Sequence, residues 1–434
     1  MDKFVIRGGN PLVGTIRVSG AKNSALPCMA AAILTEDEIV LENVPDVRDI
    51  ATERRLLASM GAMTAFGKEE DTHRVSIHCH TLSDPVAKYE IVKTMRASSL
   101  VLGPLLARTG MARVAMPGGC AIGGRPIDLH IKGLEKMGAQ IQQEHGYLEA
   151  RADRLRGAHL VFDKITVTGT EDLLMAAVLA EGDTVMENCA REPEVSDLVA
   201  LLTAMGARIE GAGTSTLRVQ GVTRLRGAHH RIQPDRIEAG TFLVAGAITG
   251  GDLTVADCNP GHLRAVISKL EEAGAQIRVL GSSAVRVQSS GQLHAADIST
   301  EEYPGFPTDM QAQYMALATQ AEGVSLVKEN IFENRFMHVQ ELVRMGANIK
   351  LDGRTATVRG PAKLSAAAVM CSDLRASASL VLAALVADGE SILDRVYHMD
   401  RGYERIEEKL QGVGAQIHRM GNVFPQGEIE TVAD

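Results

Sequence analysis

One short phrase occurs six times in the sequence, and this repeat constrains the fold more than any other feature. In each copy an amphipathic stretch ends in Gly-Ala and a second apolar stretch follows. A glycine at the end of a helix commonly takes the left-handed conformation that closes it. Each copy therefore predicts a helix, a glycine cap and a strand. The six glycines are Gly61, Gly138, Gly206, Gly274, Gly346 and Gly414.

A second phrase precedes these copies and consists of an apolar helix, a glycine-containing turn and a short strand. Examples are AVLAEGDTVMEN, GAITGGDLTVAD and AALVADGESILD. The complete unit is β-α-β-α-β, which can bury two helices against a small sheet. Its period of roughly 70 residues is too long for a solenoid repeat. Six such units predict an α/β (α+β) fold.

The length of the chain favours more than one domain. Its 434 residues exceed the size at which a single hydrophobic core stops growing. Hydrophobic residues make up 45% and charged residues 23%, a balance typical of globular proteins. Three units in each of two domains would place a boundary near the polar segment RLRGAHHRIQPD, around residue 230.

Composition and charge argue against several classes of partner. Aromatic residues are only 3%, Trp is absent, and the net charge is −9, so neither nucleic acid nor an anionic membrane is an expected partner. The N-terminus has no signal-peptide pattern, and the richest apolar segment is too short to span a membrane. We therefore expect a soluble, cytoplasmic protein in which any anion site is local.

The six cysteines are scattered and form no CxxC pair, so neither a disulfide framework nor a zinc site is expected. Cys28, Cys79 and Cys371 adjoin apolar runs and are interpreted as core residues. Cys120 differs because two glycine pairs flank it and Arg125 follows. Such a loop brings amides and a thiol close to a ligand, although a small residue with a loop role remains the alternative.

Basic residues recur where the first helix of a unit is expected to begin. Lys22, Arg96, Arg236 and Arg375 occupy such positions. A cation is mildly unfavourable there unless it helps the helix N-terminus to bind an anion. Each arginine alone is more often a surface or capping residue, but recurrence at equivalent turns favours a small polyanionic substrate. Asp309 follows Thr308 at another helix start. It is interpreted either as an N-cap of that helix or as a base beside arginines.

Nine motifs carry a resemblance to a known family. They are SGAKNSALP, KTMRAS, PGGCAIGGRPIDLH, AREPE, PDRIEAGTF, FPTDMQAQ, ENRFMH, DLRAS and DRGYERIE, in this order from residue 19 to 408. With them the chain resembles the UDP-N-acetylglucosamine enolpyruvyltransferase family, and the cysteine loop distinguishes that family from 5-enolpyruvylshikimate-3-phosphate synthase. The resemblance implies an inside-out α/β barrel of two domains, each with three β-α-β-α-β units. The expected limits are 22–232 for the first domain, 1–21 with 233–421 for the second, and 422–434 for a tail.

The resemblance also implies an activity. This is transfer of the enolpyruvyl group of phosphoenolpyruvate to the 3-hydroxyl of UDP-N-acetylglucosamine with release of phosphate, the first committed step of peptidoglycan synthesis. Such an enzyme serves cell-wall biogenesis and is a target of fosfomycin. No metal or organic cofactor is expected, the two substrates are the expected partners, and we expect a monomer.

Roles for individual residues follow from the same resemblance. Cys120 is the expected proton donor, which needs its thiol form, and Asp309 is the expected base or orienting group for the sugar hydroxyl. The residues expected to bind phosphoenolpyruvate are Lys22, Asn23, Arg125, Arg335, Arg375 and Arg401, with Arg335 and Arg375 near the carboxylate. Those expected to bind the UDP-sugar are Asn23, Arg96, Arg125, Pro126, Ile127, Asp128, Leu129, Lys164, Ile165, Thr166, Val167, Asp309 and Ile331. Supporting partners are expected at His130, Glu192, Asp235 and Asp373.

The expected phosphoenolpyruvate residues come from both domains, so we expect the sugar to bind first and drive closure. Arg48 and Gly124 replace a lysine and an alanine that are frequent in the family. Because of the change at Arg48, the resemblance does not define the contacts that form there on closure. One alternative is an enolpyruvyl transferase with another acceptor, against which the Lys164–Val167 match argues. A non-catalytic scaffold is the other alternative, and it would have no use for Cys120, Asp309 and the basic set together.

Overall fold

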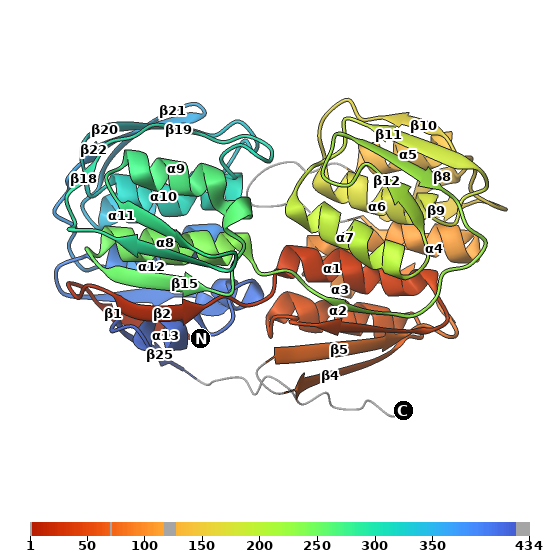
Figure 1. Ribbon diagram of the computed structural model, residues 1–434, viewed down its shortest axis with the longest axis horizontal. Coiled ribbons are helices and arrows are strands. Elements are labelled where there is room, and N and C mark those ends of the chain that lie inside the picture. The colour runs from red at the N-terminus through yellow and green to blue at the C-terminus, as the bar shows by residue number, and fades with distance from the viewer. Residues whose placement is uncertain (1, 70–71, 117–126, 422–434) are drawn as a thin grey trace.

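A computed structural model describes residues 2–69, 72–116 and 127–421, which form two halves side by side (Figure 1). The first half carries strands β3 to β14, and the second half carries β1, β2 and β15 to β25. In each half three sheets lie on the outside and helices fill the interior. The fold is thus an inside-out α/β barrel in two parts, as the sequence predicts.

The three sheets of the first half share one topology. An edge strand runs parallel to its neighbour, and the two remaining strands pair antiparallel. In spatial order they are β14 (Ala228–Arg231), β3 (Glu38–Glu42), β5 (Thr72–His78), β4 (Met63–Glu69); β6 (Val86–Ala87), β7 (Met111–Ala115), β9 (Tyr147–Arg151), β8 (Gln140–Glu144); and β10 (His159–Val161), β11 (Asp183–Glu187), β13 (Thr216–Gln220), β12 (Arg208–Glu210).

The second half repeats this topology, with one extra short strand, β19 (Ile298–Ser299), beside β20. Its sheets are β2 (Val13–Arg17), β15 (Asp252–Ala256), β17 (Ala284–Gln288), β16 (Gln276–Leu280); β18 (Leu293–His294), β20 (Ala321–Lys328), β22 (Thr355–Gly360), β21 (Asn348–Asp352); and β23 (Ala368–Met370), β24 (Glu390–Asp394), β1 (Lys3–Arg7), β25 (Gln416–Met420). Each sheet therefore adds a fourth strand to the three-strand unit expected from the repeat.

The first helices of the units are buried on nearly every side. In α8, for example, all residues but Arg236 are buried, and every residue of α10 is buried. A helix that is apolar all round belongs in an interior. These helices are α1 (Lys22–Ala31), α4 (Leu102–Thr109), α6 (Val167–Ala177), α8 (Arg236–Ile248), α10 (Gln311–Ala318) and α12 (Leu374–Ala384).

The second helices of the units bury only one face. They are α2 (Arg48–Ser59), α5 (Asp128–Lys136), α7 (Pro193–Ala204), α9 (Arg264–Glu272), α11 (His338–Arg344) and α13 (Ile406–Gln411). The remaining helical segments are α3 (Tyr89–Val92) and the 3-10 helices η1 (Ala32–Leu34), η2 (Arg96–Val101), η3 (Pro260–Leu263), η4 (Thr308–Met310) and η5 (Val396–Arg401).

The six glycine caps predicted from the repeat are confirmed. Gly61, Gly138, Gly206, Gly274, Gly346 and Gly414 all have φ between 93° and 106°. In every copy the following alanine N–H donates to the carbonyl five residues earlier, as Ala62 does to Leu57 at 3.1 Å. This is the hydrogen bond that closes a helix around a left-handed glycine. The glycine fixes the direction in which the next strand leaves.

The chain passes between the halves twice, and the two passages lie together. Strands β1 and β2 belong to sheets of the second half, and β14 completes a sheet of the first half. At the passages Ala21 N–H donates to the Gln233 carbonyl at 2.7 Å, and Asp235 N–H donates to the Ser19 carbonyl at 2.9 Å. These two hydrogen bonds hold the two passages together where the chain crosses between the halves.

Buried apolar side chains form two clusters rather than one. The first contains residues between Ala25 and Ile232, and the second contains Phe4 to Val18 together with residues between Ile237 and Ile417. The expected domain limits themselves stay a prediction. None of the helices in the described ranges is long and apolar enough to cross a membrane.

Candidate active site

The polar turns singled out in the sequence lie at helix starts, as predicted. Lys22 and Arg236 are the first residues of α1 and α8, Arg96 is the first residue of η2, and Arg375 is the second residue of α12. A basic residue at a helix start opposes the helix dipole. An anion from another element compensates for it at Lys22, Arg236 and Arg375.

Asp49 holds two of the predicted cations in what we term the Asp49 cluster. Lys22 Nζ lies 3.0 Å from Asp49 Oδ2, and Arg401 Nε lies 3.0 Å from Asp49 Oδ1. Lys22 and Asp49 come from α1 and α2 in the first half, whereas Arg401 ends η5 in the second half. The two halves are thus joined by one buried carboxylate between two cations.

The electrostatics of this cluster follow from its burial. Burial raises the pKa of Asp49, but Lys22 and Arg401 together outweigh it and hold the pKa below the usual value. One helical turn later, Glu53 is 1% exposed and its pKa rises to about 8, because it is buried and close to Asp49. The carboxylate of Asp49 is therefore ionised near neutral pH, and Glu53 adds little negative charge beside it.

Asp309 holds two further cations in what we term the Asp309 cluster. Its Oδ1 accepts from Arg335 Nη2 at 2.7 Å and its Oδ2 accepts from Arg375 Nη2 at 2.9 Å. Both arginines are buried, and Arg375 also lies over the Tyr403 ring at 5.5 Å. Burial raises the pKa of Asp309, but Arg375 and Arg335 hold the net pKa far below the usual range.

The N-cap interpretation of Asp309 is wrong, and its place beside arginines is confirmed. The cap position of η4 is Pro307, and Asp309 lies inside the first turn with its carboxylate on the two guanidinium groups. Two buried cations attract a carboxylate more strongly than a terminal amide does. Thr308 shares in the cluster, accepting from Arg335 at 3.3 Å and donating to Glu329 at 2.9 Å.

The two clusters approach each other through η5. This segment ends in Arg401 of the Asp49 cluster and packs against α12, which carries Arg375 of the Asp309 cluster. It also contacts α2, which carries Asp49. Two pairs of cations, each sharing one carboxylate, are therefore organised around one short helix.

The residues expected to bind the UDP-sugar occupy several helix starts. Asn23 is exposed at the start of α1, and Asp128 is exposed at the start of α5 beside Ile127 and Leu129. Thr166 caps α6, accepting from Gly169 N–H at 3.2 Å, with Lys164, Ile165 and Val167 adjoining it. Ile331 lies three residues after the end of β20, and its N–H donates to Glu329 at 2.9 Å. Cys120, Arg125 and Pro126 lie outside the described residues.

The expected supporting residues are placed as follows. Asp235 and Asp373 cap α8 and α12, each accepting two backbone N–H groups. Burial, then Arg96, lowers the pKa of His130 to about 4. Glu192 accepts from Tyr303 N–H at 3.4 Å and so contacts the opposite half. Asp235 and Asp373 thus fix helix starts, and Glu192 fixes a contact between the halves.

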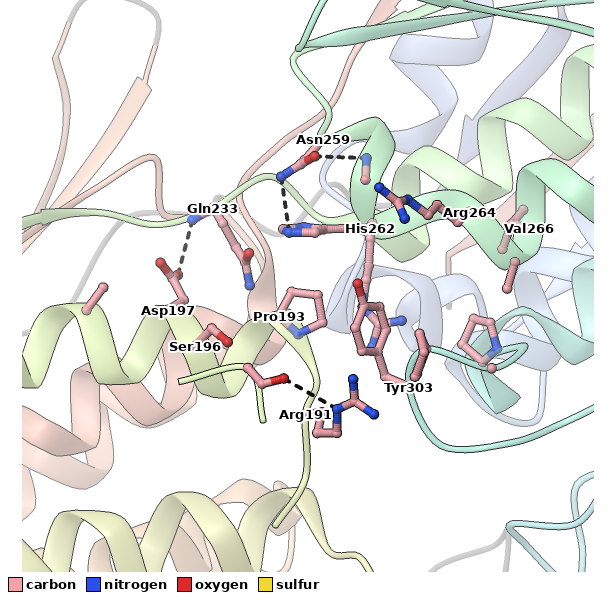
Figure 2. A pocket seen from close by; sticks show the side chains of 18 residues that line it. Arg191, Pro193, Ser196, Asp197, Gln233, Asn259, His262, Arg264, Val266 and Tyr303 are labelled. Atoms are coloured by element: carbon pink, nitrogen blue, oxygen red, sulfur yellow. Dashed lines mark hydrogen bonds between the residues drawn. The ribbon is translucent and has the colours of Figure 1, made fainter. Parts of the chain in front are cut away.

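A cavity of about 730 Å³ opens between the halves beside this region. Figure 2 shows Pro193, Ser196 and Asp197 on one side, and His262, Arg264 and Tyr303 on the other. Arg236, also lining it, is paired with Glu194 at 2.9 Å. The cavity is walled by α7 on the first half and by η3 on the second.

Sequence reasoning missed Asp49 and Glu194 as partners of the cations, and Glu329 as the acceptor of the Thr308 hydroxyl. Asp49 is the last residue of the VRD turn at residues 47–49, in which only the arginine was considered as a candidate site residue. An acid in the first turn of a helix is ordinarily explained by the helix dipole, so it draws no attention by itself. Its distance of 3.0 Å from Lys22 appears only in the fold.

Comparisons with known proteins decide the family. Residues 6–410 match the sequence profile of EPSP synthase (3-phosphoshikimate 1-carboxyvinyltransferase). The chain belongs to this enolpyruvyl transferase family. A UDP-N-acetylglucosamine 1-carboxyvinyltransferase of Acidobacterium capsulatum is 78% identical, covering 98% of this chain and 97% of the relative. One of Koribacter versatilis is 70% identical, covering 98% of each chain.

Solved structures agree with this assignment. The enolpyruvyl transferase NikO from Streptomyces tendae has a TM-score of 0.85 at 25% identity, covering 96% of this chain and 99% of that one. EPSP synthase from Acinetobacter baumannii has a TM-score of 0.73 at 19% identity, covering 97% and 100%, and shares the fold. The resemblance stated from the nine motifs is confirmed, and the protein is an enzyme of the enolpyruvyl transferase class.

Proposed function

We propose that this enzyme transfers the enolpyruvyl group of phosphoenolpyruvate to the 3-hydroxyl of UDP-N-acetylglucosamine with release of phosphate. This reaction is the first committed step of peptidoglycan synthesis. The observation that carries the proposal is the pair of clusters, in which four cations are held by two carboxylates. Phosphoenolpyruvate carries a phosphate and a carboxylate, and two cation pairs match these two anions. The relatives from Acidobacterium and Koribacter are named for this activity.

In the free enzyme the two aspartates occupy the places of the substrate anions. Asp309 stands where the carboxylate of phosphoenolpyruvate would meet Arg335 and Arg375, and Asp49 stands where the phosphate would meet Lys22 and Arg401. The cations are therefore oriented before substrate arrives, which lowers the cost of binding. Bidentate arginine geometry suits both anionic groups, and Arg125 is proposed as a further phosphate ligand.

Substrate binding would also convert Asp309 into a base. Its pKa is held down by Arg375 and Arg335, so in the free enzyme it is a poor proton acceptor. When the substrate carboxylate shares these arginines, part of that attraction is withdrawn and the pKa of Asp309 rises. The carboxylate then orients the sugar 3-hydroxyl and accepts its proton.

The proposed reaction is an addition followed by an elimination. Cys120 gives its thiol proton to C3 of phosphoenolpyruvate, the 3-hydroxyl oxygen bonds to C2, and the hydroxyl proton passes to Asp309. The Cys120 thiolate then takes a proton back from C3 of the tetrahedral phospho-ketal, the C2–C3 double bond re-forms, and the C2–O bond to phosphate breaks. The proton held by Asp309 passes to the leaving phosphate, which returns both side chains to their starting forms. The cations stabilise the charge that grows on the leaving phosphate.

The nucleotide sugar is proposed to bind first and to draw the halves together. Its proposed ligands are Asn23, Arg96, Arg125 to Leu129, Lys164 to Val167, Asp309 and Ile331. All but the last two belong to the first half, whereas Arg335, Arg375 and Arg401 belong to the second. The paired passages at Ser19–Ala21 and Gln233–Asp235 offer the hinge. Closure would exclude water from the reacting carbons of phosphoenolpyruvate.

The surroundings in which the enzyme works are part of the same proposal. We place it in the cytoplasm as a monomer that acts on its two small-molecule substrates, without nucleic acid or a membrane as partner. The chemistry needs a proton donor, a base and an anion clamp, all of which amino-acid side chains provide. It calls for no metal ion or organic cofactor.

A phosphate-release assay tests the proposal. The purified chain is incubated with phosphoenolpyruvate and either UDP-N-acetylglucosamine or shikimate 3-phosphate, and free phosphate is followed with time. We expect release only with the UDP-sugar. Phosphate release only with shikimate 3-phosphate would show that shikimate 3-phosphate is the acceptor. No phosphate release with either acceptor would refute enolpyruvyl transfer.

A further inference from the structure

Three side chains that no step above uses converge inside the first half. Cys28 lies on α1, Asp197 on α7 and His230 on β14. One ligand atom from each, a sulfur, a carboxylate oxygen and a ring nitrogen, lies within 4.8 Å of the other two. His230 Nε2 and Asp197 Oδ1 are 2.9 Å apart. Because the three residues are far apart in the chain, their spacing in the sequence does not indicate that they lie together.

The Asp197 carboxylate is oriented by its second oxygen. Ser24 Oγ donates to Oδ2 at 2.6 Å, and Gln233 N–H donates to the same oxygen at 3.2 Å. The Gln233 side chain in turn donates to Ser24 Oγ at 3.2 Å. Outer hydrogen bonds of this kind fix ligand carboxylates in protein metal sites. They leave Oδ1 directed at the imidazole.

The cluster has a path to solvent. Asp197 lines the cavity of about 730 Å³ between the halves. Figure 2 shows Asp197 on the cavity wall next to Ser196, with the backbone of Gln233 bonded to its carboxylate. Cys28 is fully buried, whereas Asp197 lines the cavity, so an ion would arrive from the side of Asp197. Water from the cavity can supply a fourth ligand.

We propose that Cys28, Asp197 and His230 form a binding site for a zinc-class divalent cation, with water from the cavity as the fourth ligand. Mixed sulfur, nitrogen and oxygen ligands in tetrahedral arrangement suit Zn²⁺. Bonds of about 2.0 to 2.3 Å place tetrahedral ligand atoms roughly 3.3 to 3.8 Å apart, so the ligand atoms need to shift by on the order of 1 Å. The ion would tie α1, whose first residue is Lys22, to α7 and β14.

Binding would release one proton to solvent. Burial, and then the charges of Asp197 and Glu171, raise the pKa of the Cys28 thiol, so the free protein holds the protonated form. The sulfur–metal bond replaces the sulfur–hydrogen bond, and no oxidant or reductant takes part.

Cobalt titration tests the site without reference to activity. The reduced, chelator-treated full chain is titrated with Co²⁺, and we expect a thiolate-to-metal charge-transfer band with the visible bands of tetrahedral cobalt. Added Zn²⁺ should remove these bands, because it binds such sites more tightly than Co²⁺. Zn²⁺ should also raise the melting temperature of the protein.

Matched variants identify the ligands. Cys28→Ala should abolish the charge-transfer band, and His230→Gln should weaken binding by at least about 100-fold, more than loss of an outer hydrogen bond costs. Cys371→Ala, a buried thiol of the second half, and Cys120→Ala should keep both bands. No band in the unaltered protein, a band that survives Cys28→Ala, or one lost in Cys371→Ala would overturn the proposal. If Cys28→Ala does not fold, an unchanged affinity in His230→Gln would overturn it equally.

Discussion

Replacing Asp49 by asparagine isolates the claim that a carboxylate stands in for the substrate phosphate. The change keeps the shape of the side chain but removes the charge shared by Lys22 and Arg401 at 3.0 Å each. A buried hydrogen bond to a charged group contributes about 1.5–3 kcal/mol. Arg401 is 38% exposed, so its share is reduced to roughly 0.5–1 kcal/mol. Asp49→Asn should therefore lower the free energy of unfolding by about 2–4 kcal/mol.

Calorimetry with and without inorganic phosphate measures this effect. For a cooperative unit of about 200 residues, a loss of about 2–4 kcal/mol corresponds to a fall in melting temperature of about 4–16 °C. Phosphate at about 100 times its Kd stabilises by about 2.7 kcal/mol, which would offset the loss. In the unaltered enzyme phosphate must displace Asp49 first, so it should raise the melting temperature by less than in Asp49→Asn.

Asp84→Asn provides the matched control in the same half. Asp84 is 42% exposed and pairs with Lys88 at 3.5 Å, so its loss should change stability by less than about 0.5 kcal/mol. The reasoning is refuted if Asp49→Asn melts like the unaltered enzyme. It is refuted equally if phosphate stabilises the variant no more than it stabilises the unaltered enzyme.

Three further outcomes are expected. Cys120→Asp should retain turnover, because aspartic acid can donate a proton, but it should resist alkylation by the epoxide fosfomycin. A fosfomycin adduct detected in the variant by mass spectrometry would exclude Cys120 as the target of fosfomycin. Asp309→Asn should lower kcat by about 10²–10⁴ while substrate still binds, and steady-state kinetics with unchanged kcat would exclude Asp309 as the base. Burial raises the pKa of Glu404, but His73, Ser19 and Lys409 hold it at about 2, below 4.5. The stability that ionised Glu404 contributes is thus full above about pH 4.5 and lost toward pH 2. The difference in unfolding free energy between the unaltered enzyme and Glu404→Gln should shrink over that window, and a difference independent of pH would contradict the assignment.

Much of the fold could be predicted because its strongest signal is local. A left-handed glycine after an amphipathic helix depends only on neighbouring residues, so all six caps are visible in the sequence. The fourth strand of each sheet was harder to predict from the sequence. In the last unit it is β1, from the opposite end of the chain, which pairs with β24 and β25. Pairing over such a separation leaves no mark in local periodicity.

The site was predictable only in part for the same reason. Helix-start cations such as Lys22 and Arg375 stand out because they oppose the helix dipole. Their carboxylate partners, Asp49 and Asp309, look like ordinary helix-start acids until the fold brings them within 3.0 Å of the cations. The grouping of Cys28 with His230 likewise depends on the packing of both α1 and β14 against α7. The reaction itself was inferred from the resemblance to the family. The relatives confirm that resemblance.

Identification of the product tests the central claim most directly. The enzyme is incubated with phosphoenolpyruvate and UDP-N-acetylglucosamine, and the nucleotide sugar is examined by NMR while phosphate is measured in the same sample. We predict an enolpyruvyl ether at the sugar 3-position, with its two vinyl protons, formed in equal amount to the phosphate released. Phosphate without the ether, or an unaltered sugar and no phosphate, would contradict the account.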